Sequence, residues 1–251
     1  MSGHSKWATI KRKKGATDAA RARVFTKLIK EITVAARMGG GDPDANPRLR
    51  MAIQNGKGAN MPSQNVERAI KKGTGDLEGV SFEEITYEGY GPGGAAIIIE
   101  ASTDNRNRTV GEIRHTFTKL GGNLAEANAV AFMFERKSVI ELEPGEKTED
   151  EIMEAALEAG AEDVVQEEDG TFTVTGEQSS LNDLREALEA LEVNITTAET
   201  AMIPQNYMDV DEKHARTLIK LMEQLDDLDD VQRVYSNFDI SEELLEKLAE
   251  E

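Results

Sequence analysis

Apolar residues recur at helical spacing in the first third of the chain. At about 100° per residue, Phe25, Leu28, Ile32 and Ala36 fall within one arc of a helix. Basic residues lie on the opposite side of the same helix. The pattern predicts a helix over residues 18–38 with one packed face and one basic face that is free to meet phosphate groups.

Two shorter amphipathic helices are expected next. Asn46 before Pro47 is typical of a helix start, because asparagine caps free backbone N–H groups and proline suits the first turn. The apolar spacing of residues 62–72 predicts another short helix, which Gly73 and Gly75 end. Three helices of this size predict a small all-α domain.

The pattern changes to alternation after residue 80. Residues 82–90 and 95–101 predict the two strands of a hairpin, joined by a glycine-rich turn. A helix is expected over 107–120 and a third strand over 130–135. The turn formally fits the dinucleotide pattern G-x-G-x-x-G, but that pattern indicates a cofactor only where it opens a helix after a strand. A strand follows here, so we interpret it as a hairpin turn.

Residues 138–203 are predicted to form a self-contained unit. A strand over 138–142 precedes a helix whose start, Thr148-x-x-Glu151, matches a capping box. Two hairpin strands, a second helix and a final strand over 193–202 follow. The order βαββαβ is the ferredoxin-like plan.

One more helix and one more strand are predicted after Pro204. The helix is expected to be capped by Asp209, and the strand covers 231–235. A lone helix and strand cannot bury their apolar faces, whereas the earlier hairpin, helix and strand lack one helix and one strand for a second sandwich. We therefore expect them to complete that sandwich.

The expected fold class is α+β with three domains. A small all-α helical domain at the N-terminus is followed by two ferredoxin-like sandwiches, the last inserted in the middle one. The predicted boundaries are 1–75 for the helical domain, 76–136 plus 204–240 for the middle domain, and 137–203 for the inserted domain.

Charge is sorted along the chain. Residues 1–75 contain 16 Lys and Arg against 5 Asp and Glu, whereas residues 76–251 contain 13 against 43. A cationic segment of this density attracts the phosphate backbone of nucleic acids, and a solvated lysine-rich face without a partner is the alternative. We predict that the front segment binds nucleic acid and that residues 1–15 form an extended arm.

The predicted contacts are the basic residues of the front segment, one tryptophan, and two arginines at a later strand-to-helix junction. They are Lys6, Trp7, Lys11, Arg12, Lys13, Lys14, Arg21, Arg23, Lys27, Lys30, Arg37, Arg48, Arg50, Lys57, Arg68, Lys71, Lys72, Arg106 and Arg108. At the junction, residues 104–109, two interpretations stay open. Asp104, Asn105 or Asn107 caps a helix, or the helix start makes a second nucleic-acid contact.

Neither an enzyme nor a cofactor or metal is predicted. His4, His115 and His214 lie far apart, cysteine is absent, and no nucleophile motif is recognisable. The acidic run 226–230 lacks the glycine and the ligand spacing of a calcium loop. We expect that run to be a solvated helix end.

Composition and hydropathy place the chain among folded, water-soluble proteins. Hydrophobic residues make up 39% and charged residues 31% of the sequence. No apolar run approaches the roughly 20 residues of a membrane helix, and the first residues lack the apolar core of a signal peptide. We expect a cytoplasmic monomer that binds neither membranes nor a small-molecule substrate.

Several stretches, taken together, resemble the YebC family. They are GHSKWATIKRKKGATDAARARVFTKLIKEI near the start, ERAIKKGTG after Met61-Pro62, then YEGYGPGG, TDNRNRT, GGNLA and MFERK. The resemblance spans essentially the whole chain and implies an N-terminal helical domain followed by two α/β domains. Members are commonly described as DNA-binding transcriptional regulators. Some, including a mitochondrial translational activator of a cytochrome oxidase subunit, look like ribosome-associated translation factors.

Three functions follow as hypotheses. In the first, a non-enzymatic transcriptional regulator grips DNA phosphates with its basic front segment and reads little sequence. In the second, a translation factor binds ribosomal RNA, with Trp7 and the arm entering folded RNA by stacking and charge. In the third, a protein-interaction scaffold binds a basic partner through its acidic sheets.

Overall fold

The computed structural model describes residues 18–79, 81–167, 170–241 and 244. Tertiary contacts divide these residues into two compact units. Unit 1 covers residues 134–205, and unit 2 contains the described residues before and after it. The boundaries predicted at residues 75, 136 and 203 stay predictions.

The first part of unit 2 is helical, as predicted. Its helices are α2 (Asp18–Gly39), α3 (Pro47–Gly58) and α4 (Ser63–Thr74). Ile32 and Ala36 from α2, Leu49 from α3 and Ala69 from α4 are at most 1% exposed and share one apolar cluster. Helices α3 and α4, with 12 residues each, are held mainly by this shared burial, because isolated helices of that length are marginal in water.

Two residues fix how the helices meet. Asn46 caps α3 as predicted, since its side-chain oxygen accepts from the N–H of Leu49, and its amide also donates to the carbonyl of Ala35 in α2. Gly73 lets α4 approach α2 closely. A Cβ atom at this position would lie 2.7 Å from the Cβ of Ala36 and closer still to the carbonyl oxygen of Thr33.

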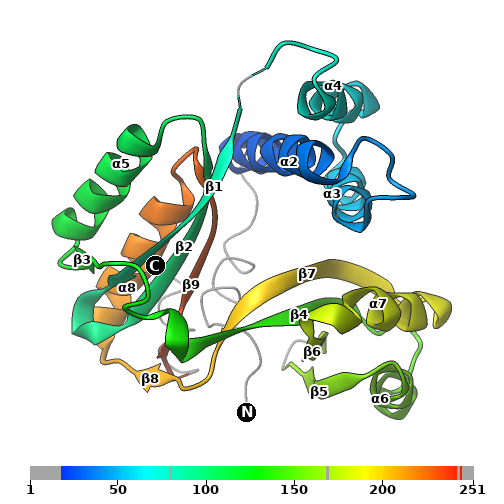
Figure 1. Ribbon diagram of the computed structural model, residues 1–251. Coiled ribbons are helices and arrows are strands. Elements are labelled where there is room, and N and C mark those ends of the chain that lie inside the picture. The colour runs from blue at the N-terminus through cyan, green and yellow to red at the C-terminus, as the bar shows by residue number, and fades with distance from the viewer. Residues whose placement is uncertain (1–17, 80, 168–169, 242–243, 245–251) are drawn as a thin grey trace. The chain divides into compact units, whose positions relative to one another are not determined.

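The rest of unit 2 contains a four-stranded antiparallel sheet with two helices on one face, and a separate two-stranded parallel sheet (Figure 1). Its elements are β1 (Glu83–Tyr90), η1 (Pro92–Gly94), β2 (Ala96–Thr103), α5 (Arg106–Lys119), β3 (Asn123–Leu124), η2 (Ala131–Met133), β8 (Met208–Asp209), α8 (Glu212–Asp226), β9 (Val231–Ser236) and β10 (Phe238–Asp239). The strand order is β3-β1-β2-β9, and α5 and α8 share one apolar core with the sheet. The late helix and strand therefore join the earlier hairpin, and the glycine-rich segment is a turn between β1 and β2.

Unit 1 has the predicted βαββαβ order. Its elements are β4 (Phe134–Glu143), α6 (Glu149–Glu158), β5 (Ala161–Gln166), β6 (Phe172–Glu177), η3 (Gln178–Ser180), α7 (Leu181–Ala190) and β7 (Asn194–Pro204). The sheet order β5-β6-β4-β7 is that of a ferredoxin-like sandwich. The predicted capping box is present, with Thr148 and Glu151 each bonding the other's backbone. The α+β fold class is confirmed.

The strand predicted over residues 130–135 is wrong. Residues 131–133 form the short helix η2, and residues 134–143 form one continuous strand, β4, in unit 1. The polar residues 135–137 do not interrupt β4, because β4 pairs with β7 along its whole length. The third strand of the unit 2 sheet is instead the two-residue β3.

The predicted cap of the late helix is also shifted. Asp211, not Asp209, caps α8, and its carboxylate accepts from the N–H of His214. Asp209 lies in β8, which pairs with β10.

Candidate nucleic-acid interface

Three cations of α2, Arg23, Lys27 and Lys30, are paired with carboxylates of the same unit. Lys30 is only 8% exposed, and its ammonium donates to Asp230 at 2.7 Å and to the carbonyl of Asp229 at 2.7 Å. Its Nζ also lies 5.4 Å from the centre of the Phe82 ring, within the range of a cation–π contact. The expectation that the basic face of this helix is entirely free is therefore wrong for Lys30.

Asp230 is the centre of this buried network. Its side chain is 4% exposed. One carboxylate oxygen accepts from Lys30, and the other accepts from Arg108 at 2.5 Å and from the hydroxyl of Thr109 at 2.7 Å. Burial by itself raises the pKa of Asp230, but the hydrogen bonds from Lys30, Arg108 and Thr109 outweigh it and lower that pKa to about 2. Asp230 is therefore ionised at neutral pH.

Two further pairs continue outward along α2. Lys27 lies 2.9 Å from Asp226, and Arg23 lies 3.0 Å from Asp227. Together with Lys30 and Asp230 they form what we call the ion-pair ladder: Arg23–Asp227, Lys27–Asp226 and Lys30–Asp230. From the sequence we expected the acidic run 226–230 to be a solvated helix end. That expectation is wrong, because Asp226, Asp227 and Asp230 pair with cations of α2.

Sequence reasoning missed this acidic run as a functional element. A signal was present, because Arg23, Lys27 and Lys30 are spaced i, i+4 and i+7 and so occupy one stripe of the helix. The four aspartates among residues 226–230 form a dense opposite charge. Only the fold, however, brings the two stretches together across about 200 residues.

Arg48 and Arg108 are also engaged within unit 2. Arg48 bonds Glu31 at 2.8 Å and Glu84 at 2.5 Å, and Glu84 is the main cause of its raised pKa. At the strand-to-helix junction, Asn105 caps α5 by accepting from the N–H of Arg108, which confirms the capping interpretation for that residue. Arg106 is exposed. Whether these arginines contact nucleic acid stays a prediction.

The remaining described cations of the helical part form a different group. Arg37 bonds the hydroxyl of Ser81, and Arg50 bonds the carbonyl of Pro43 at 3.1 Å. Lys57, Arg68, Lys71 and Lys72 make no ion pair with any carboxylate among the described residues.

Arg68, Lys71 and Lys72 sit on the side of α4 that faces away from α2. Arg68 and Lys71 are exposed, whereas Val66, Ala69 and Gly73 are the buried residues of the helix. Lys71 and Lys72 lie in its last turn, where the helix dipole favours positive charge. This face is a preformed basic surface, and Glu67 is the only acidic residue of α4.

The predicted arm lies outside the described residues. This applies to Lys6, Trp7, Lys11, Arg12, Lys13 and Lys14. Arg21 is within α2, but its side chain is also outside the described part of the chain. Nucleic-acid contact by these residues stays a prediction.

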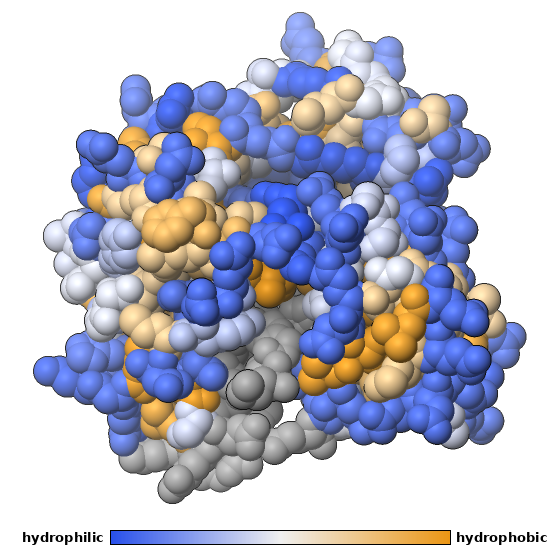
Figure 2. Space-filling model, turned by 60° about the horizontal axis from the view of Figure 1, so that its bottom comes forward, coloured by the Kyte–Doolittle hydropathy of each residue, from blue (hydrophilic) through white to orange (hydrophobic). Residues whose placement is uncertain are grey.

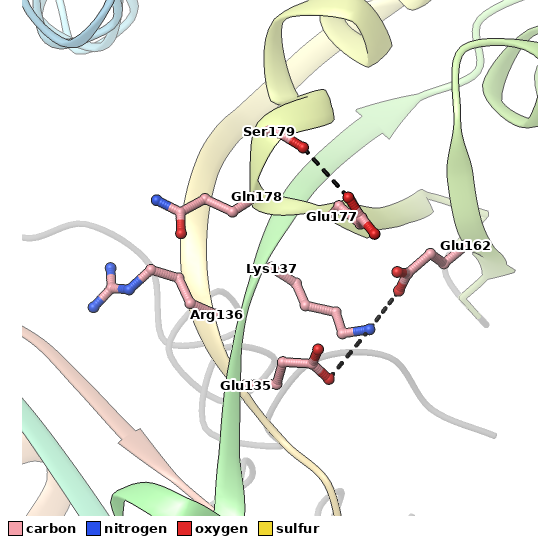
Figure 3. A pocket seen from close by; sticks show the side chains of 7 residues that line it. All are labelled: Glu135, Arg136, Lys137, Glu162, Glu177, Gln178 and Ser179. Atoms are coloured by element: carbon pink, nitrogen blue, oxygen red, sulfur yellow. Dashed lines mark hydrogen bonds and ion pairs between the residues drawn. The ribbon is translucent and has the colours of Figure 1, made fainter.

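A cavity of about 540 Å³ lies in unit 1. It is lined by Glu135, Arg136, Lys137, Glu162, Glu177, Gln178 and Ser179. In Figure 3, Lys137 points between Glu162 and Glu135 and bonds both. Chiefly because of the hydrogen bond to Glu162, the pKa of Lys137 is raised above its ordinary value, which favours the protonated amine.

The surface of the described residues is largely hydrophilic on the face drawn in Figure 2, with smaller apolar patches between. Among the residues that the structure describes, no group of three or more His, Cys, Asp or Glu is placed to hold a metal ion. Within the same ranges, no helix has both the length and the hydropathy to span a membrane.

Two family models match the chain over nearly all of its length. Residues 5–76 match the model described as the TACO1/YebC protein N-terminal domain, and residues 82–238 match the one described as the TACO1/YebC second and third domain.

Individual relatives match over the full length as well. A probable transcriptional regulatory protein from Geobacter sulfurreducens is 58% identical over 248 residues, which is 99% of this chain and 100% of the relative. Another with the same description, from Desulfotalea psychrophila, is 58% identical over 251 residues and covers 100% of both chains. The crystal structure of a conserved hypothetical protein from Aquifex aeolicus is 50% identical and superposes with a TM-score of 0.87, covering 95% of this chain and 98% of that one.

Proposed function

This chain belongs to the TACO1/YebC family, and from that premise we propose that it is a non-enzymatic regulatory protein that binds duplex DNA through its basic N-terminal helices and arm. The observation that carries the proposal is the basic face of α4. Arg68 and Lys71 are exposed there and make no ion pair within the described residues, whereas Arg23, Lys27 and Lys30 of α2 have carboxylate partners.

An unpaired basic face is what a phosphate backbone recognises. Cations that already hold a carboxylate must first release it, whereas Arg68 and Lys71 only displace water and the counterions that surround the DNA. Contacts to phosphates position a protein without reading bases, so the sequence preference should be weak. The names of the relatives, probable transcriptional regulatory proteins, favour DNA as the polyanion.

The test measures binding of the full-length protein to a short labelled duplex by fluorescence anisotropy, over a series of salt concentrations. The double variant R68Q/K71Q removes two cations of α4. We expect the plot of log affinity against log salt to become shallower by about 0.9 for each phosphate that is no longer neutralised. At 0.1 M salt the affinity should fall by about an order of magnitude for each of these phosphates.

A matched control removes two exposed lysines from another helix. Lys213 and Lys220 lie on α8 and are exposed, so K213Q/K220Q changes the net charge equally. If the control loses as much affinity as R68Q/K71Q, or if the slope of R68Q/K71Q equals that of the wild type, α4 is not the contact surface.

The arm is tested separately and the polyanion is varied. Neutralising Lys11, Arg12, Lys13 and Lys14 should weaken binding to any nucleic acid and flatten its salt dependence. Competition between the duplex and a folded ribosomal RNA fragment then identifies the partner. Clear preference for the RNA would replace the transcriptional role with the translational one.

A further inference from the structure

We propose that Asp226 and Asp227 act as an internal substitute for nucleic-acid phosphates, covering Arg23 and Lys27 until a polyanion displaces them. The inference rests on the proposed function and concerns its regulation. While the pairs are closed, α2 contributes little to the binding surface, and α4 and the arm make the first contact. Opening the outer pairs of the ion-pair ladder then extends that surface by two cations.

The ladder is graded from buried to exposed. The side chains of Lys30 and Asp230 are 10% and 4% exposed, those of Lys27 and Asp226 are 16% and 15%, and those of Arg23 and Asp227 are 39% and 54%. The most exposed pair therefore contains Arg23, the member of the ladder nearest in sequence to the basic arm. Exchange with an incoming anion is easiest at that end, where both partners already meet water.

The inner pair differs from the outer two in what holds it. Asp230 is bonded by Arg108 and Thr109 as well as by Lys30, so it cannot be displaced without disrupting several buried bonds. Asp227 is exposed, and its carboxylate pairs with Arg23 at the rim of the ladder. We therefore infer that Lys30 stays docked while the outer cations change partners.

The placement of the outer aspartates is poor for stability alone. Asp226 ends α8 and Asp227 is its C-cap, where the helix dipole disfavours negative charge. Neighbouring Asp229 and Asp230 add like-charge repulsion. The Arg23–Asp227 pair is also exposed, and exposed ion pairs stabilise a fold little. Their geometry does suit a phosphate mimic, since lysine and arginine bond carboxylate and phosphate oxygens in the same way.

The decisive experiment is a variant cycle on the full-length protein, with a labelled DNA duplex as the probe. D226N/D227N uncovers the two cations, R23Q/K27Q removes them, and the fourfold variant does both. We expect D226N/D227N to bind about an order of magnitude more tightly at 0.1 M salt, with a slope steeper by about 0.9 for each cation engaged. R23Q/K27Q should cancel that gain in the fourfold variant.

A control separates this effect from a general change of net charge. E154Q/E158Q removes two exposed carboxylates from α6 in unit 1, with the same change of two charges. Its affinity should stay within about twofold of the wild type, because the carboxylates that pair with Arg23 and Lys27 are those of Asp227 and Asp226, so that losing Glu154 and Glu158 uncovers neither cation. Thermal unfolding of every variant shows whether it is folded at the assay temperature.

Three results overturn the inference. The first is that D226N/D227N binds DNA no more tightly than the wild type. The second is that the control E154Q/E158Q gains as much affinity, and the third is that the gain persists in the fourfold variant. Failure of the proposed function looks different, because the wild type itself would then show no salt-dependent binding to DNA.

Discussion

Replacing Asp230 with asparagine should weaken unit 2 more than any other single loss of charge in the ion-pair ladder. The substitution keeps the size of the side chain and removes its charge. Lys30 is then left as a buried ammonium without a carboxylate partner, and it faces only neutral acceptors such as the carbonyls of Asp229 and Ser102, at 2.7 and 3.4 Å. Arg108 keeps its 2.8 Å contact with Asp104. The substitution thus removes the central carboxylate of the network, whereas the Arg108–Asp104 pair is kept.

Two arguments give the size of the stability loss in Asp230→Asn. Breaking a buried ion pair by removing one partner costs about 3–5 kcal/mol, and the surviving carbonyl contacts place Asp230→Asn at the lower end, about 3 kcal/mol. The pKa of Asp230, about 2 against an ordinary 3.8, corresponds to about 2 kcal/mol of stabilisation at neutral pH. Both arguments give a loss of a few kcal/mol, which is large enough to measure.

Urea unfolding followed by circular dichroism measures the loss, and hydrogen exchange of peptides from α5 and β9 assigns it to unit 2. The reciprocal variant K30M and the double variant K30M/D230N complete a cycle. The double variant should lose less than the sum of the singles, since it leaves no unpaired ammonium opposite the amide. E154Q, which alters an exposed carboxylate of α6, is the control and should stay within about 0.5 kcal/mol of the wild type.

The same network has a defined pH dependence. Because the pKa of Asp230 is lower in the folded than in the unfolded protein, its contribution is complete above the unfolded value of 3.8 and is lost as the pH falls through about 2. The wild type should therefore lose more stability than D230N between about pH 4 and pH 2. If D230N matches E154Q in urea at neutral pH, or has the acid profile of the wild type, Asp230 does not hold the network.

Two further substitutions test how the helices of unit 2 meet. Gly73→Ala should lower the free energy of unfolding in urea by about 1–3 kcal/mol, because the added Cβ would lie 2.7 Å from that of Ala36. In the control Gly58→Ala the added Cβ meets nothing within 4 Å, so the free energy of unfolding should stay the same or rise. Equal changes for the two variants would refute the close approach of α4 to α2. Asn46→Ala should cost about 2 kcal/mol or more of stability, since it removes the cap of α3 and a buried hydrogen bond to α2. Thr148→Ala, at the exposed cap of α6, should cost only about 1 kcal/mol. Thermal melts of both variants measure the difference.

The local elements were predictable because their causes lie within a few residues. The cap at Asn46, the capping box at Thr148 and the apolar stripe of α2 need only the neighbouring turn to be recognised. The βαββαβ plan of unit 1 followed from such elements taken in order. The strand predicted over residues 130–135 failed because polar residues on a strand do not mark its end when a partner strand, here β7, pairs along its length.

The sequence by itself determined most of the helices and strands, the family, and the sorting of positive charge to the front of the chain. It could not determine which of those charges are available. Arg23, Lys27 and Lys30 on α2 have the helical spacing of a free basic face, and so do Arg68 and Lys71 on α4. Only the tertiary structure distinguishes them, because the partner of a charge is set by contacts between residues about 200 positions apart.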